Sequence, residues 1–148
     1  MKIRAGVKED LPQVLELIKE LAEYEKGLDQ VTNTVEMMEK DGFGDHPIFE
    51  FFVAELDGFI VGLSLCYFRY STWKGKRLYL EDIIVTQEER GKGLGKQLFE
   101  ATFTHGKRRG CTGMTWQVLD WNKSAINFYT KYYQAQLDEE WINCHIDF

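Results

Sequence analysis

The sequence contains little proline and little cysteine: its 148 residues include only two prolines and three cysteines. The cysteines, Cys66, Cys111 and Cys144, are widely spaced and form no C-x-x-C pair. A disulfide framework is therefore excluded, and we expect reduced thiols, no metal site and a cytoplasmic location. No apolar run approaches the length of a membrane span, and the start MKIRAGVKEDL lacks the apolar stretch of a signal peptide.

Positive charge is also in short supply. Lys and Arg number 18 against 24 Asp and Glu, which gives a net charge of −6 and a pI near 5.1. This balance disfavours nucleic acid and anionic membranes as partners, and it suits either a cationic substrate or simple solubility. Hydrophobic residues make up 44% of the chain and aromatic residues 14%, which indicates a globular chain. The length predicts one domain over residues 1–148.

Hydrophobic periodicity predicts an α/β chain in the order β-α-α-β-β-β-α-β-α-β. Asp57-Gly58 predicts a hairpin between two strands. Asp10 and Asn122 are candidate helix N-caps. The predicted strands cover 2–7, 48–56, 59–70, 77–85, 111–119 and 141–148, and the predicted helices cover 8–27, 32–42, 94–107 and 122–133.

A glycine cluster lies in the segment EERGKGLGKQLF, residues 88–99, between a predicted strand and a predicted helix. A Walker A loop would need glycine and a hydroxyl residue where the chain has Arg90 and Gln97. A dinucleotide loop would need glycine at Lys96 or at Leu98. What remains is an R-x-x-G-x-G pattern at a strand-to-helix turn, which favours a phosphate or pyrophosphate ligand over a plain surface turn.

The segment RGKGLG, residues 90–95, resembles the acetyl-CoA pyrophosphate loop of the GNAT superfamily of N-acetyltransferases. LYLEDIIV before it and WNKSAINFY after it resemble the spermidine/spermine and thialysine branch, as do LIKELAEYEKGLDQV, DGFGDHP and YSTWKGK. The resemblance implies a GNAT fold, a mixed twisted sheet of about six to seven strands flanked by about four helices. It further implies acetyl-CoA as cosubstrate, no metal, and a homodimer.

Acetyl transfer to an alkylamine needs a neutral amine, although such amines have a pKa of about 10.4. A proton acceptor is therefore required, and the resemblance implies that Glu81, which interrupts an apolar strand, is a water-assisted base. By strand alternation Asp82 should point to the opposite face and be structural. The resemblance implies that Tyr129 is the general acid that protonates the thiolate, with Phe128 as its core neighbour.

Further contacts follow from the resemblance by position. The pantetheine arm should pair with the backbone of Ile83, Ile84 and Val85. The pyrophosphate should meet Arg90, Gly91, Lys92, Gly93, Leu94, Gly95 and Lys96, and a second cofactor contact should come from Asn122, Lys123, Ser124 and Ala125.

Substrate contacts are implied at Tyr24 and Glu25, at Ser71 and Thr72, and at Thr115, Trp116 and Gln117. Polyamine-selective members tend to carry an acidic residue at the place of Ser71. Hydroxyls there suit an amino-acid head group, so a thialysine or lysine-like substrate is favoured over spermidine. The alternatives are a polyamine acetyltransferase, an acetyltransferase for another amine, and a non-catalytic acyl-CoA-binding domain.

Two features depart from this pattern. Tyr133 occupies the place where the family often has a glycine, which bears on the turn after the helix. Cys111 could suggest an acyl-cysteine intermediate. However, no histidine neighbours it in sequence, and His105 is expected to be incidental. Direct transfer in a ternary complex is therefore the predicted mechanism.

Overall fold

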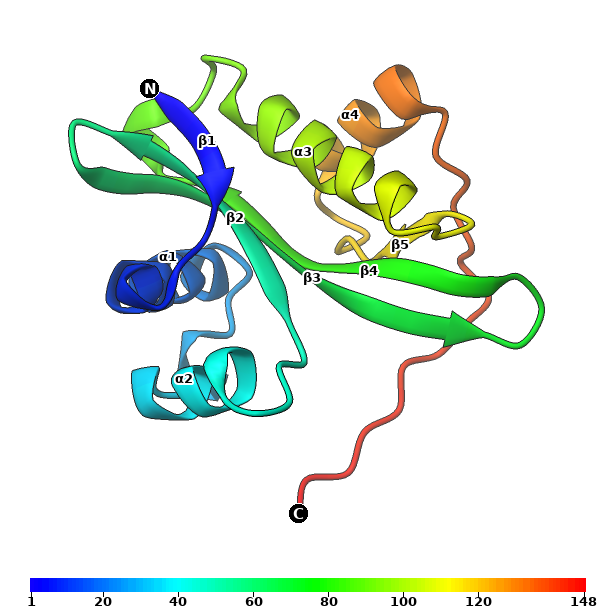
Figure 1. The fold of residues 1–148 in the computed structure, drawn as a ribbon. Helices are drawn as coiled ribbons and strands as arrows, with labels where there is room; N and C mark the ends of the chain where they lie inside the picture. Colours follow the sequence, from blue (N-terminus) through cyan, green and yellow to red (C-terminus); the bar gives the residue numbers. More distant parts are fainter. The chain divides into compact units, whose positions relative to one another are not determined.

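A five-stranded sheet in the order β1-β2-β3-β4-β5 is the centre of residues 1–117 in the computed structural model, which describes residues 1–148 (Figure 1). Strands β1 to β4 pair antiparallel, and β5 runs parallel to β4. The sheet is thus mixed, as predicted, but it has five strands and not six to seven. The strands are β1 (Lys2–Ala5), β2 (Glu50–Leu56), β3 (Phe59–Ser71), β4 (Gly75–Val85) and β5 (Met114–Trp116).

Helices cover both faces of this sheet (Figure 1). On one face, called the α1 face below, α1 (Leu11–Tyr24) and α2 (Val35–Phe43) contribute Leu11, Val14 and Met38 to a core shared with strand residues such as Leu63, Leu65 and Ile84. On the other, the α3 face, α3 (Leu94–Arg108) packs Leu94 and Leu98 against Ala54 and Val85. Short 3-10 turns precede α1, α2 and α3, at Lys8–Asp10, Leu28–Gln30 and Gln87–Glu89.

Local sequence signals set several element boundaries. Asp57 and Gly58 have φ of 50° and 82°, which confirms the predicted hairpin between β2 and β3. Thr34 caps α2 by accepting a hydrogen bond from the backbone N–H of Met37 at 3.1 Å. Asp10 precedes α1 but makes no cap bond to it. Its carboxylate accepts from the Val7 N–H at 2.9 Å and pairs with Arg4 at 2.8 Å, so it fixes the turn before the helix.

Residues 118–148 form a second compact unit. Its helix, α4 (Lys123–Tyr133), is capped by Asn122, whose side chain accepts from the Ala125 N–H, as predicted. The predicted strand at 141–148 is wrong, because residues 134–148 form neither helix nor strand. Ile142 and Ile146 are each 87% exposed. Apolar residues that alternate along the chain become a strand only when an edge is available to pair with them, and no such pairing occurs here.

Tyr133 ends α4 in regular helical geometry. The left-handed turn falls one residue later, at Gln134, with φ 49° and ψ 39°. The tyrosine at the expected glycine position therefore needs no unusual backbone, and the strain lies on the glutamine. None of the helices of the protein is both long and apolar enough to span a membrane.

Candidate active site

A β-bulge in β4 shapes the candidate site. Leu65 of β3 pairs with Asp82 and the next residue, Cys66, pairs with Leu80, so that Glu81 has no partner on β3. Such an extra residue breaks the alternation of side chains along the strand. Residues directly opposite each other in a sheet share a face, which places Asp82 beside Leu65 on the α1 face.

Glu81 lies on the same face. Tyr67 follows Leu65 by two residues and so shares its face, and the Tyr67 hydroxyl donates to Glu81 Oε1 at 3.3 Å. The expectation that Asp82 points away from Glu81 is therefore wrong. The cause is the bulge, which a single strand's alternation does not reveal.

Two tyrosines flank the Glu81 carboxylate. The rings of Tyr67 and Tyr79, which pair across β3 and β4, lie 5.3 Å apart. Burial, followed by the negative charge of Glu81, raises the pKa of Tyr67 to about 12 and also raises that of Tyr79. Both phenols therefore stay protonated at neutral pH, and Tyr67 is a permanent hydrogen-bond donor to Glu81.

Three carboxylates gather here. Burial raises the pKa of Asp82 to about 6, and the charges of Glu81 and Glu25 add to the effect. Glu25 is the C-cap residue of α1, and partial desolvation raises the pKa of its carboxyl as well. The negative charges of these carboxylates repel one another. Binding of a cationic ligand is therefore favoured, because an ammonium group offsets this repulsion. Tyr24, the last residue of α1, is 43% exposed beside it.

Strand β4 presents an open edge beyond the bulge. Its pairing with β5 ends at Leu80 and Trp116, although β4 continues to Val85. Residues 81–85 thus carry backbone groups that face no strand on that side, and such an edge can pair with the amides of a ligand. The residues predicted to meet pantetheine, Ile83 to Val85, lie on it. Their side chains anchor the strand in both cores: Ile83 and Val85 toward α3, and Ile84 toward α1.

The glycine loop follows directly. Gly91 and Gly93 have φ of 79° and 83°, and a methyl group added to either would meet no atom within 4 Å. Gly93 is the N-cap of α3 and accepts a hydrogen bond from the Gln97 N–H at 3.1 Å, but its hydrogen side chain cannot cap the N–H groups of the first turn. An open backbone surface and a helix N-terminus together form a favourable environment for phosphate.

Charged neighbours hold this loop in place. Arg90 donates from Nε to the Val85 carbonyl at 2.8 Å, and its guanidinium lies 3.7 Å from Glu20 and 5.7 Å from the centre of the Tyr24 ring. Lys92 is paired with Glu89 at 2.6 Å, which offsets part of its charge. Of the predicted loop residues, Arg90 thus holds the loop to the end of β4.

The predicted substrate residues in this unit do not all lie together. Ser71 accepts hydrogen bonds from the backbone N–H groups of Trp73 and Lys74 at 3.2 and 3.0 Å, so it shapes the β3–β4 turn that includes Thr72. Thr115 pairs with Tyr79 on the α1 face. Trp116 lies on the α3 face, where its ring packs on Phe99 at 5.3 Å, and Gln117 follows the end of β5.

The remaining predicted residues belong to the second unit. Tyr129 in α4 is buried, with 7% of its surface exposed, whereas Phe128 is half-buried and touches the rings of Tyr129, Tyr132 and Tyr133. The expectation that Phe128 is the buried residue of the pair is therefore reversed. Asn122 Oδ1 lies 3.4 Å from the Ser124 hydroxyl and from the Ala125 N–H, and Lys123 donates to the Asp120 carbonyl at 3.0 Å.

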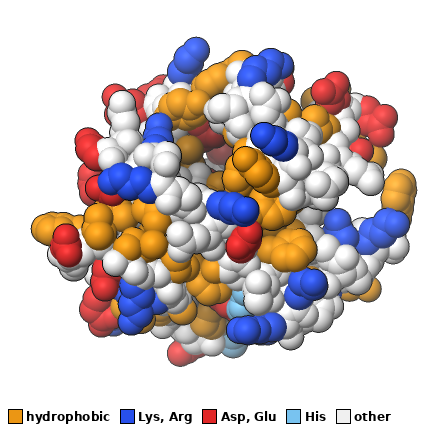
Figure 2. Space-filling view, turned by 90° about the horizontal axis from the view of Figure 1, so that it is seen from above, with side chains coloured by type: hydrophobic (Ala, Val, Ile, Leu, Met, Phe, Trp, Pro, Cys, Tyr) orange, Lys and Arg blue, Asp and Glu red, His pale blue; other side chains and the backbone are white.

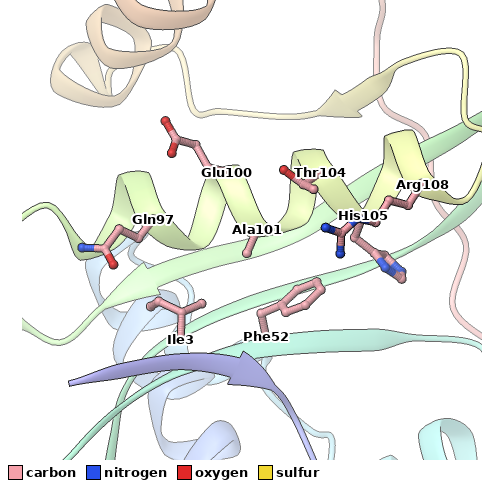
Figure 3. A pocket seen from close by; sticks show the side chains of 8 residues that line it. All are labelled: Ile3, Phe52, Gln97, Glu100, Ala101, Thr104, His105 and Arg108. Atoms are coloured by element: carbon pink, nitrogen blue, oxygen red, sulfur yellow. The ribbon is translucent and has the colours of Figure 1, made fainter.

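A depression of about 470 Å³ lies between α3 and strands β1 and β2, on the α3 face (Figure 3). His105 lines it, with Nε2 at 2.7 Å from Glu50 Oε2, close enough for an ion pair although the angles do not suit a hydrogen bond. The ring also packs against Phe52 and Phe68. None of the predicted site residues lines this depression.

The buried Cys66 thiol has its pKa raised to about 12 by burial, so it stays protonated.

Charge is not concentrated by sign over the surface that Figure 2 presents, where Lys and Arg side chains are interspersed with acidic and hydrophobic ones. No group of three or more His, Cys, Asp or Glu side chains is arranged to hold a metal ion.

The fold and the strand-loop-helix unit of β4, the glycine loop and α3 are those of an acetyltransferase family. A model of the acetyltransferase (GNAT) family matches residues 12–133, and the chain belongs to this family. It is an N-acetyltransferase by that membership and by its relatives. The fold is also that of an aminoglycoside acetyltransferase from an uncultured soil metagenomic sample solved with trehalose, at a TM-score of 0.82, 22% identity, and coverage of 99% of this chain and 96% of that one.

More similar in sequence is a thialysine N-epsilon-acetyltransferase of Bos taurus, 42% identical over 135 residues that cover 86% of this chain and 79% of the relative. A spermidine/spermine N(1)-acetyltransferase-like protein of Homo sapiens is 37% identical over 94% of this chain but only 21% of its own length. An aminoglycoside N-acetyltransferase in complex with CoA shares the fold at a TM-score of 0.75 and 20% identity, with coverage of 97% and 93%. The chain is thus an enzyme that acetylates amines.

Proposed function

We propose that this enzyme transfers an acetyl group from acetyl-CoA to the primary amine of a small cationic molecule, with thialysine or a lysine-like amino acid as the favoured substrate. The observation that carries the proposal is the bulge in β4. It places Glu81 beside Asp82 and within reach of the Tyr67 hydroxyl, directly before the open edge and the glycine loop. The 42% identity to a thialysine N-epsilon-acetyltransferase supports the same substrate class.

The residues present fit acetyl-CoA. The positive φ at Gly91 and Gly93 and the open space around both glycines suit a pyrophosphate, and residues 81–85 suit the amides of a pantetheine arm. When bound, acetyl-CoA supplies the activated acetyl group as a thioester. Lys96 and the backbone from Arg90 to Gly95 would hold its phosphates, and residues 122–125 of the second unit would add a further contact.

Glu81 would accept the ammonium proton, directly or through one water, so that the amine nitrogen can attack. The Tyr67 hydroxyl orients the Glu81 carboxylate, since it donates to Oε1 at 3.3 Å and stays protonated. Glu25 and Asp82 would supply negative charge to draw in the cationic substrate. Tyr129 would donate a proton to the departing thiolate. We propose direct transfer, which requires no acyl-cysteine.

Calorimetry tests the cosubstrate. The loop matches neither nucleotide template, so acetyl-CoA should bind whereas NAD and ATP should not. Tight binding of NAD or ATP together with no binding of acetyl-CoA would contradict this assignment. A panel of amines scored by CoA release then tests the substrate class. Thialysine should show a higher kcat/KM than spermidine.

A polyamine is the second candidate, and the three carboxylates favour it because they could meet more than one ammonium group. Ser71→Asp tests the choice cleanly, since an aspartate can accept the same two turn hydrogen bonds from Trp73 and Lys74. The substitution should shift kcat/KM from thialysine toward spermidine. If wild type prefers spermidine and the ratio does not move, the preference for an amino acid is wrong.

We also propose that residues 1–148 act as a single acetyltransferase domain that works as a cytoplasmic homodimer. The family match crosses from the first unit into the second, which supports one domain. Exposed apolar residues at 141–148 support self-association, because such a segment gains from pairing with a strand edge. Light scattering on the full chain should give twice the monomer mass. Removal of residues 141–148 should give monomers.

A further inference from the structure

We propose that Arg69 reads the carboxylate of the substrate and thereby selects an amino acid over a diamine. This inference rests on the function proposed above and names a further specificity residue for it. Arg69 lies on the α1 face of β3, two residues beyond Tyr67, and its guanidinium carbon lies 5.2 Å from the centre of the Tyr79 ring.

Arg69, the tyrosine pair and the carboxylates form a line along one sheet face. The rings of Tyr67 and Tyr79 separate the cation from the acids, because the Tyr67 hydroxyl meets Glu81 while Arg69 lies over Tyr79. The β3–β4 ribbon runs past α1 and α2 toward its hairpin (Figure 1), and Arg69 lies two residues before the end of β3 at that hairpin. These two helices therefore do not cover that part of the face.

The spacing suits a lysine-like molecule. Tyr79 and Glu81 are two residues apart on β4, which corresponds to about 7 Å of strand. A lysine-like chain has a comparable length between its head group and its terminal amine. The amine would meet Glu81 and Asp82, the aliphatic stem would lie on the tyrosine rings, and the carboxylate would reach Arg69.

Arg69 is available for this role. It is exposed and forms no ion pair with a carboxylate of the protein, and its contact is the Tyr79 ring. Stacking on a ring fixes the guanidinium plane and leaves its outward N–H groups free for a bidentate bond to a carboxylate. An ammonium group placed there would be repelled. An amino acid and a diamine both bring an ammonium group to this end, but only the amino acid offsets it with a carboxylate that can pair with Arg69.

Its cross-strand partner provides a matched control. Arg77 pairs with Arg69 in the β3–β4 register and carries the same charge. Its guanidinium instead lies 3.5 Å from the Thr112 hydroxyl and against Gly113, beside the segment that leads into β5. Arg77→Gln therefore removes one positive charge from the neighbouring strand without removing the group over Tyr79.

The test uses two substrates that differ only in the carboxylate: thialysine and bis(2-aminoethyl) sulfide. We expect wild type to prefer thialysine in kcat/KM. Arg69→Gln should lower kcat/KM for thialysine about tenfold, mainly through KM, and leave the diamine unchanged or improved. Arg69→Glu should reverse the preference, and Arg77→Gln should leave the ratio within about twofold.

Other outcomes separate the failures. Equal losses on both substrates in Arg69→Gln would mean that Arg69 only positions Tyr79, and they would overturn the inference. If Arg69→Gln leaves the ratio of the two kcat/KM values unchanged, or if Arg77→Gln changes it equally, the inference about Arg69 is also overturned. Acetylation of both substrates by these variants would still support the proposed function. If wild type acetylates neither amine but acetylates another class, both the function and the inference fail.

Discussion

Strand β4 with its glycine loop differs from residues 118–148 in how completely its groups are partnered within the chain. In the first region, Glu81 meets Tyr67, Arg90 meets the Val85 carbonyl, and the strand is anchored in two cores. In the second, α4 is locally capped, but the segment after it leaves Ile142 and Ile146 exposed. In the first region the local sequence signals coincide with available packing partners, whereas in the segment after α4 they do not.

The largest effect is expected in the second region. Tyr129→Phe removes the proposed acid and keeps the ring, so kcat should fall about 10²–10⁴-fold with little change in the affinity for acetyl-CoA. Single-turnover kinetics should locate the loss in the chemical step. Tyr132→Phe, an exposed tyrosine of the same helix, is the control and should retain activity. Wild-type kcat in Tyr129→Phe, with chemistry rate-limiting, would make Tyr129 a packing residue.

In the first region, Glu81→Gln should lower kcat/KM by a similar factor at pH 7. The loss should shrink as the pH rises toward the pKa of the amine, about 10.4, because the neutral amine then forms without a base. The pH profile measures this directly. Glu16→Gln, an exposed substitution in α1, is the control. A loss that is independent of pH would show that Glu81 binds the substrate and does not accept its proton.

Asp82→Asn should change stability in a pH-dependent way. The folded pKa of about 6 is above the ordinary 3.8, so the native state favours the protonated acid. The stabilising effect of protonation is present below about pH 3.8 and is lost as the pH rises through 6. Asparagine mimics the neutral form, so at pH 8 the free energy of unfolding should rise by up to about 3 kcal/mol.

Denaturant midpoints at pH 8 and pH 4 check this expectation. At pH 4 the variant and wild type should be nearly equal. Asp57→Asn in the β2–β3 turn is the control, because asparagine tolerates the same positive φ. If Asp82→Asn gives the same shift at both pH values, the carboxylate is not desolvated in the native state.

The glycine loop can be tested with a pair of alanine substitutions. Gly93 and Gly110 have φ of 83° and 77°, and a methyl group at either meets no neighbouring atom. Each substitution should therefore lower stability by about 1–2 kcal/mol through backbone strain alone. Only Gly93→Ala should also weaken acetyl-CoA binding in calorimetry, because its methyl group projects where the phosphates are proposed to lie. Equal affinities in the two variants would place the ligand elsewhere.

The elements that the sequence predicted best are those in which turn chemistry decides the backbone. Asp57-Gly58 and the glycines before α3 need positive φ, and this need is visible in the residues themselves. The face of Asp82 was not predictable, because the bulge at Glu81 depends on the register between β3 and β4. Arg69 and Tyr79 were missed for the same reason, since only cross-strand pairing brings them together. Of the predicted site residues, Glu25 and Glu81 lie in the acidic cluster, whereas Trp116 lies on the α3 face.

The smallest effect concerns the end of α4. Gln134 adopts φ 49° and ψ 39°, a left-handed conformation that a side chain makes unfavourable. Gln134→Gly removes that strain, but glycine also loses more entropy on folding, so the net gain should be about 0.5–1 kcal/mol. Thermal unfolding should show a slightly higher Tm. Gln134→Ala, which keeps the Cβ, should show no gain. A loss of stability in Gln134→Gly would mean that the glutamine side chain, and not the backbone turn, secures the end of the helix.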